Sequence, residues 1–242
     1  MLLSFFKDIK RKRLFAIVVW FLVIISFSSG NLVNPNLWFD EALQFWSSKG
    51  QHRYSDYDTP QAENLSTVIE SNYTNTWDPA GFTILLHFLG KITNKLWIFR
   101  SLTLLFILCS ALLLSSLASH WQANNILAYF SGLVLLLSAQ ISHYAFEIRP
   151  YSMELLHSIL AVYIVCRANR SWSITKSLLF GVALAITMAS RYTTIFPAFF
   201  CTIFVAFKFF QDPEKENFLA FRKREAVNFL ALFLPSIIIG IA

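Results

Sequence analysis

The apolar residues of this chain fall into long blocks separated by short polar stretches, a pattern typical of helices that cross a membrane. A spanning helix needs roughly 17–25 mostly apolar residues. We expect seven blocks to form transmembrane helices, at residues 14–29, 97–119, 125–142, 151–166, 177–190, 194–210 and 227–242. The predicted fold is therefore all-α, a polytopic membrane protein.

The first block also has the look of a secretory signal. Five basic residues lie in 7–13, and Ser26-Phe27-Ser28 imitates a small-x-small cleavage site. Aromatic residues follow that site, however, and six further apolar blocks follow those. We therefore expect an anchor that is not cleaved.

The segment 78–97 is ambiguous, because its apolar core at 80–89 is only about half the length that spanning requires. Cytoplasmic loops of membrane proteins collect Lys and Arg. If 78–97 does not cross and the N-terminus is cytoplasmic, three cytoplasmic segments hold 13 of the 20 Lys and Arg residues. If it crosses, that bias is lost. The pattern thus predicts a juxtamembrane helix on the outer surface.

Composition supports the membrane assignment. The chain is 56% hydrophobic and only 14% charged, with mean hydropathy +0.53, whereas soluble domains carry about 25% charged residues. The net charge of +6 follows from membrane topology, so no nucleic-acid partner is expected. We expect one transmembrane domain over 1–242, with an outer loop at 30–96 that contains juxtamembrane helices. Within that loop, 47–77 is predicted to be a polar loop.

The first candidate site is the aromatic and acidic run around Asp40 and Glu41, just after the first block. Neighbouring side chains of a helix point about 100° apart, so one carboxylate can face a substrate while the other contacts a metal or a cation. Partly dry aromatic surroundings raise the pKa of a carboxyl group, which suits a general base. The alternative is that Asp40 caps an interfacial helix within an aromatic belt.

Three further candidates lie at the ends of apolar blocks. Glu147 and Arg149 occupy a short turn, and ionisable residues at membrane depth mark functional sites by default. Arg191 occupies another turn, where its planar guanidinium suits a phosphate. Asp78 precedes Pro79. The alternatives are a Glu147–Arg149 pair that only neutralises the turn, an Arg191 that reaches lipid headgroups, and an Asp78 that caps the surface helix opened by Pro79.

Five motifs, taken in order, resemble the glycosyltransferase C fold, especially the branch of the protein O-mannosyltransferases and the lipid A aminoarabinose transferases. They are the aromatic-Asp40-Glu41 run, Asp78-Pro79-Ala80-Gly81-Phe82 with Leu85-Leu86-His87, Arg100-Ser101-Leu102, Glu147-Ile148-Arg149-Pro150-Tyr151, and Arg191-Tyr192. The resemblance covers nearly the whole chain. It departs at Asp78 and Arg191, where that branch commonly has histidines. Its members usually continue for several more spans, which implies that 1–242 is an N-terminal portion.

The resemblance implies transfer of a mannose-like or related sugar from a polyprenyl-phosphate-linked donor to a hydroxyl group of a lipid, glycan or protein acceptor. The reaction would invert the anomeric centre at the outer face of a bacterial inner membrane. Asp40 would be the general base, and Glu41 would orient a divalent metal ion or an arginine. Arg149 and Arg191 would bind the donor phosphate. Positioning or acceptor roles would fall to Asp78, Arg100, Glu147, Tyr151 and Tyr192.

No cofactor is required by this resemblance, and a divalent metal ion at Asp40 and Glu41 stays open because members of the family differ in metal use. Two other functions also stay open. A secondary transporter or lipid-carrier flippase would use Glu147 and Arg149 as a substrate path, and a truncated, catalytically silent membrane subunit would serve only interactions. The charges lie at span ends and no internal repeat is evident, which favours the enzyme over a transporter.

Overall fold

The computed structural model describes Leu32 and residues 34–51, 62–76, 78–121, 125–168, 173–210 and 218–241. Every regular element in these ranges is helical, so the predicted all-α class is confirmed for the part of the chain described. The elements are α2 (Phe39–Ser48), α3 (Leu65–Asn75), α4 (Gly81–Gly90), α5 (Leu96–Trp121), α6 (Asn125–Leu137), α7 (Ala139–Tyr144), α8 (Tyr151–Arg167), α9 (Ile174–Met188), the short 3-10 helix η1 (Tyr192–Thr194), α10 (Ile195–Phe210) and α11 (Phe218–Ile241).

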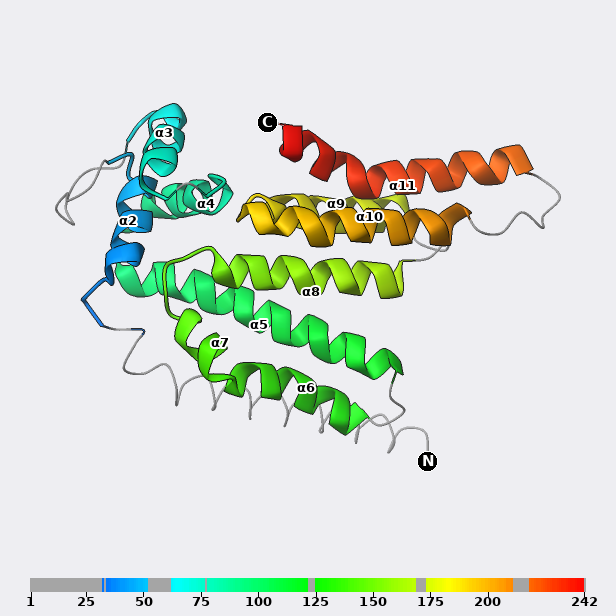
Figure 1. Cartoon of the computed structure of the whole chain (residues 1–242), viewed down its shortest axis with the longest axis horizontal. Helices are drawn as coiled ribbons and strands as arrows, with labels where there is room; N and C mark the ends of the chain where they lie inside the picture. Colours follow the sequence, from blue (N-terminus) through cyan, green and yellow to red (C-terminus); the bar gives the residue numbers. More distant parts are fainter. Residues whose placement is uncertain are drawn as a thin grey trace.

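The long helices lie roughly alongside one another, and the three helices α2, α3 and α4 gather at one end of them (Figure 1). Helix α5 packs against α6 and α8. Helix α8 also packs against α9 and α10, and α9 packs extensively against α11. The core between α8, α9, α10 and α11 contains Leu160, Ile164, Leu184, Val205 and Leu232. This arrangement leaves the beginning of α8 and the end of α9 near α2 and α4 (Figure 1).

One helix in the described part of the chain is both long enough and apolar enough to cross a membrane. It is the stretch Leu96–His120 of α5, which matches the span predicted at 97–119. The apolar stretches of the other helices are shorter, among them Ile174–Met188 in α9 and Tyr192–Lys208 through α10. The structure therefore supports membrane association through α5. The span predicted at 14–29 lies outside the described residues.

The single helix predicted over 125–142 is wrong. Helix α6 ends at Leu137, and Ser138 adopts an extended backbone (ψ 126°) before the six-residue helix α7 begins. Ser138 is a residue type that competes with helix by bonding to the nearby backbone, and the sequence after it is no longer uniformly apolar. The break changes the direction of the chain so that α7 leads directly into the turn that carries Glu147 (Figure 1).

The polar loop predicted over 47–77 is also wrong, because α3 lies within it. Polar side chains hold α3 against the end of α2: Asn75 Nδ2 donates to Ser47 Oγ at 2.9 Å, and Ser71 Oγ donates to the backbone carbonyl of Gln51. Periodicity of apolar residues could not reveal this helix, since its buried face contains Ser71, Asn72 and Asn75.

Helix α4 fulfils the expectation of a short helix within 78–97. Its ten residues span about 15 Å at 1.5 Å per residue, half the thickness of a bilayer core. It packs on α2 through a buried hydrogen bond from Gln44 Nε2 to Thr83 Oγ1, and His87 Nδ1 lies 2.9 Å from the carbonyl of Ser48. Its place outside the membrane stays a prediction.

The contact between α9 and α11 depends on the absence of a side chain at Gly181. A Cβ atom there would lie 2.4 Å from the backbone oxygen of Leu232. We expect Gly181→Ala to lower the free energy of unfolding by about 1–3 kcal/mol, because α11 must move away or strain. The midpoint of denaturant unfolding in detergent measures the loss.

The matched control is Leu179→Ala on the same helix, where the side chain is 66% exposed. We expect that change to stay within about 0.5 kcal/mol. Equal losses from the two variants would contradict the close packing at Gly181.

Candidate functional site

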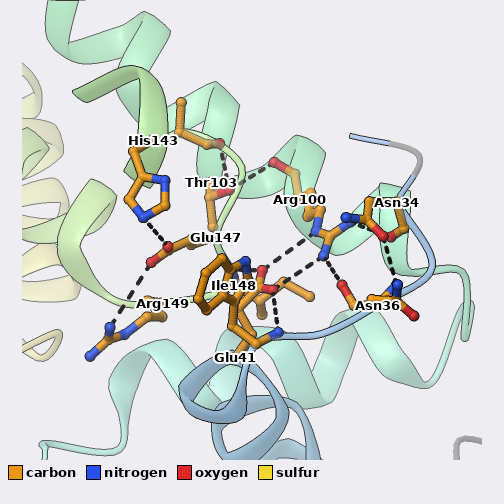
Figure 2. Close-up of polar contacts among 11 residues, drawn as sticks. Asn34, Asn36, Glu41, Arg100, Thr103, His143, Glu147, Ile148 and Arg149 are labelled. Atoms are coloured by element: carbon orange, nitrogen blue, oxygen red, sulfur yellow. Dashed lines mark hydrogen bonds and ion pairs between the residues drawn. The ribbon is translucent and has the colours of Figure 1, made fainter. Parts of the chain in front are cut away.

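A buried ion pair lies where α2, α5 and the turn before α8 meet. Arg100 Nη2 lies 3.2 Å from Glu41 Oε2, and the two side chains are only 3% and 1% exposed. Arg100 also donates to the backbone carbonyls of Asn34 and Asn36, which holds the segment before α2 (Figure 2). Glu41 thus orients an arginine, one of the two roles that its sequence position suggested.

Glu41 also organises the start of its own helix. The backbone N–H of Trp38 donates to Glu41 Oε2 at 3.1 Å, which satisfies one of the amides that a helix start leaves without an internal partner. The N-cap residue of α2 is Trp38. The alternative in which Asp40 caps this helix is therefore wrong, and Asp40 lies one residue inside the first turn.

The turn between α7 and α8 is held from two sides. Glu41 Oε1 accepts a hydrogen bond from the backbone N–H of Ile148 at 2.9 Å, and Thr103 Oγ1 donates to the carbonyl of Ala145 at 2.9 Å (Figure 2). Because the side chain of Ile148 is buried, the turn presents its two charged neighbours, Glu147 and Arg149, in a fixed arrangement.

Arg149 pairs with Asp40 across 109 positions of sequence. The distance from Arg149 Nη1 to Asp40 Oδ2 is 3.1 Å, whereas the distance to Glu147 Oε2 is 4.0 Å. The alternative of a simple Glu147–Arg149 pair therefore accounts for only the longer contact. The Asp40 side chain is 54% exposed, so it stays accessible to a molecule outside the bundle.

Glu147 has a closer partner in α7. His143 Nε2 lies 2.8 Å from Glu147 Oε1, with the imidazole half exposed and the carboxyl group largely buried. Burial raises the pKa of Glu147 above its ordinary value, and the positive charges of His143 and Arg149 act against that rise. This carboxyl group therefore gains a proton more readily than an exposed glutamate does.

The ring of Tyr151 contacts both of the arginines predicted to bind phosphate. The guanidinium carbon of Arg149 is 4.4 Å from the ring centre, and that of Arg191 is 4.7 Å from it. Arg149 Nη2 also donates to Tyr151 Oη at 2.6 Å. The two guanidinium carbons therefore lie no more than about 9 Å apart, although they come from turns more than 40 residues apart. Tyr144 packs on the same ring with centres 4.8 Å apart.

Arg191 is held by two carboxylates. Its Nε lies 3.4 Å from Asp78 Oδ1 and its Nη1 lies 3.1 Å from Glu154 Oε2, while Thr193 Oγ1 donates to Glu154 Oε1. Burial opposes the charge of Arg191, but Asp78, Glu154 and Tyr151 outweigh it and raise the pKa of Arg191. The same environment leaves the pKa of Asp78 above its ordinary value, since burial outweighs the neighbouring arginine.

Asp78 does not cap the helix that follows it. Helix α4 begins at Gly81 with Ala80 as its N-cap residue, so the capping alternative is wrong. The side chain of Asp78 points instead to Arg191, and its carbonyl accepts a hydrogen bond from Asn72 Nδ2. Asp78 therefore joins the segment before α4 to the turn after α9.

The structure brings most of the predicted site residues into one polar cluster: Asp40, Asp78, Glu147, Arg149, Tyr151 and Arg191. Glu41 and Arg100 lie beneath it as a buried support. Tyr192, the neighbour of Arg191, is 62% exposed. Sequence reasoning missed Glu154 and His143. Glu154 could have been recognised as an acidic residue inside an apolar block. His143 could have been recognised because it lies four residues before Glu147.

A divalent metal ion does not fit Asp40 and Glu41 together. Both Glu41 oxygens accept hydrogen bonds from Arg100 or from backbone amides, while Asp40 faces Arg149. Within the described ranges, no group of three or more His, Cys, Asp or Glu side chains could hold a metal ion.

We expect Glu41→Gln to lower the free energy of unfolding by about 3–5 kcal/mol, because it leaves the buried charge of Arg100 without its counter-charge. Thermal or denaturant unfolding in detergent measures the loss. The control is Glu70→Gln, an exposed acid in α3, which should change little. Replacing Glu41 and Arg100 together by Met should restore part of the loss. A Glu41→Gln variant as stable as the control would refute the importance of this pair.

The raised pKa of Asp78 makes the free energy of unfolding depend on pH. Between its ordinary value of 3.8 and its raised value, the folded protein binds more protons than the unfolded chain, so the free energy of unfolding falls as pH rises. Asp78→Asn removes this contribution. We expect the melting temperature of the variant, relative to the original chain, to increase as pH rises from about 4 to about 6. A difference that stays constant with pH would contradict the burial of Asp78.

Comparison with known proteins adds no relative to this geometry. No protein-family model, no curated protein and no solved structure matches the chain. The likeness to the glycosyltransferase C fold therefore depends on the five sequence motifs alone.

Proposed function

We propose that this chain is a membrane glycosyltransferase that moves a sugar from a polyprenyl-phosphate-linked donor to an acceptor hydroxyl group. The observation that carries the proposal is the joint position of Arg149 and Arg191 around Tyr151, with the Asp40 carboxylate 3.1 Å from Arg149. Two guanidinium groups beside an accessible carboxylate offer a place for an anionic leaving group next to a base.

In the proposed reaction Asp40 takes the proton of the acceptor hydroxyl group as its oxygen attacks the anomeric carbon. The bond between that carbon and the phosphate oxygen breaks, and polyprenyl phosphate leaves with the bonding electrons. Displacement from the opposite face inverts the anomeric centre. Arg149 and Arg191 stabilise the negative charge that grows on the phosphate. Both are 27% exposed, so each can reach a ligand from its present position.

The ion pair between Asp40 and Arg149 has a role in this scheme. While the pair is intact, Arg149 Nη1 engages Asp40 Oδ2 at 3.1 Å, so that oxygen is not available to an acceptor hydroxyl group. A donor phosphate competes with Asp40 for Arg149. Binding of the donor would thus release the carboxylate for proton transfer when the leaving group is already in place.

We also propose that the chain crosses a bacterial inner membrane seven times, with a cytoplasmic N-terminus and the cluster at the outer face. The three helices α8, α9 and α10 have 15–17 residues each, close to the minimum for spanning. The cluster residues come from the start of α2, the turn before α8 and the turn after α9, which lie at one end of the bundle (Figure 1). A single face of the membrane can therefore hold the whole cluster.

The test is transfer of labelled sugar from a polyprenyl-phosphate-linked donor in proteoliposomes that contain the purified chain. We expect Asp40→Asn to lower the turnover rate by about 10²–10⁴-fold, because the amide cannot accept the proton. Since Asp40 is 54% exposed, the melting temperature should change little. The control Glu63→Gln, at another exposed acid, should keep full activity.

Three outcomes would overturn the proposal. Near-normal turnover by Asp40→Asn would show that Asp40 is not the general base. Absence of transfer by the unaltered chain with every polyprenyl-phosphate sugar tried would favour the silent membrane subunit. Uptake of a solute driven by an ion gradient, abolished by changes at Glu147 and Arg149, would favour the transporter.

A further inference from the structure

The outward face of α10 carries a continuous row of phenylalanine side chains. We call it the aromatic stripe, and it consists of Phe196, Phe199, Phe200, Phe204 and Phe207, each 55–64% exposed. Their spacing of three and four residues places them along one side of the helix. From the first ring to the last the stripe extends for about 16 Å, at 1.5 Å per residue.

The stripe is not needed to hold α10 in the bundle. The opposite face of the helix is buried through the small side chains Ala198, Cys201 and Val205. Insertion into a membrane does not demand it either, because Phe is no better than Leu or Ile for that purpose. The exposed faces of the neighbouring helices are in fact aliphatic, with Ile174, Leu178, Leu179, Val182 and Ile186 on α9 and Val227, Leu230, Leu234, Ile237 and Ile238 on α11.

The stripe begins at Phe196, five residues after Arg191 of the polar cluster. Helix α10 follows η1 without a break, and η1 follows Arg191 directly. The guanidinium groups of Arg191 and Arg149 face the same Tyr151 ring. A ligand with an anionic head and a long apolar tail could therefore place its head at the arginines and its tail on the stripe.

We propose that the aromatic stripe of α10 binds the isoprenoid chain of the polyprenyl phosphate whose head lies at Arg149 and Arg191. This inference rests on the proposed function. Within a bilayer, ordinary lipid tails are as apolar as the protein, so a bound chain must be selected by packing. Rings have few rotatable bonds and flat faces, so they lose little conformational entropy when a chain packs on them. A row of them favours a stiff, methyl-branched chain over mobile acyl tails.

The test compares a polyprenyl phosphate with phosphatidic acid, which has a similar head but two acyl chains, by competition binding to the purified full chain in nanodiscs. The variant replaces Phe199, Phe200 and Phe204 by Leu, which keeps the helix face apolar. We expect its affinity for polyprenyl phosphate to fall about tenfold or more, from the loss of three ring contacts. Its affinity for phosphatidic acid should not change.

The matched control replaces Leu178, Leu179 and Val182 of α9 by Ile, and both affinities should stay as in the unaltered chain. Tight, selective binding of polyprenyl phosphate that survives the loss of the three rings would show that the isoprenoid chain does not bind at the aromatic stripe. The proposed function would be unaffected. Binding that fails to distinguish the two lipids in the unaltered chain would likewise overturn the stripe. Binding of polyprenyl phosphate that is unaffected by Arg191→Gln would overturn the proposed function itself.

Discussion

Two opposite charges, Glu41 and Arg100, are buried together where α2, α5 and the turn before α8 meet, and the position of the site depends on them. Removing two charges from water costs several kcal/mol per ion, which only good geometry and further hydrogen bonds repay. Both conditions hold, because Glu41 also accepts the amides of Trp38 and Ile148 while Arg100 donates to two backbone carbonyls. These bonds fix the beginning of α2 against the turn before α8. Asp40 is next to Glu41 and Arg149 is next to Ile148, so Arg149 Nη1 lies 3.1 Å from Asp40 Oδ2.

A second contact, between the start of α4 and the end of α9, positions the other half of the cluster. The amide of Gly81 donates to the carbonyl of Ala189 at 3.0 Å, and a Cβ atom on Gly81 would lie 2.4 Å from that of Ala189. The start of α4 therefore touches the end of α9 at a point where only glycine fits. Asp78 lies just before Gly81 and Arg191 lies just after Ala189, so this contact brings the two residues together and their ion pair can form. Together these two contacts bring four separate segments of chain into one cluster around Arg149 and Arg191.

The sequence predicts the helices far better than the contacts between them. Apolar length gives α5 almost to the residue, because a long uniform block has no competing conformation. It fails at Ser138, where one polar residue redirects the chain, and at α3, whose buried face is polar. The individual site residues were recognisable as ionisable groups near the ends of apolar blocks. Their pairing was not, since the partner of Arg149 is fixed by the buried contact of Glu41 with Ile148, 107 positions away.

The charge balance of the cluster bears on how an anion can bind there. Four carboxylates surround two arginines, since Asp40 and Glu147 face Arg149 while Asp78 and Glu154 face Arg191. A phosphate that enters must therefore displace a carboxylate from an arginine or meet one that has gained a proton. Burial raises the pKa values of Glu147 and Asp78, so each takes up a proton more readily than an exposed carboxyl group of its kind. Asp40 pairs with Arg149, and its side chain is 54% exposed. In the proposed reaction this division matters, because the carboxylate released by the phosphate is then the accessible one that can act on an acceptor.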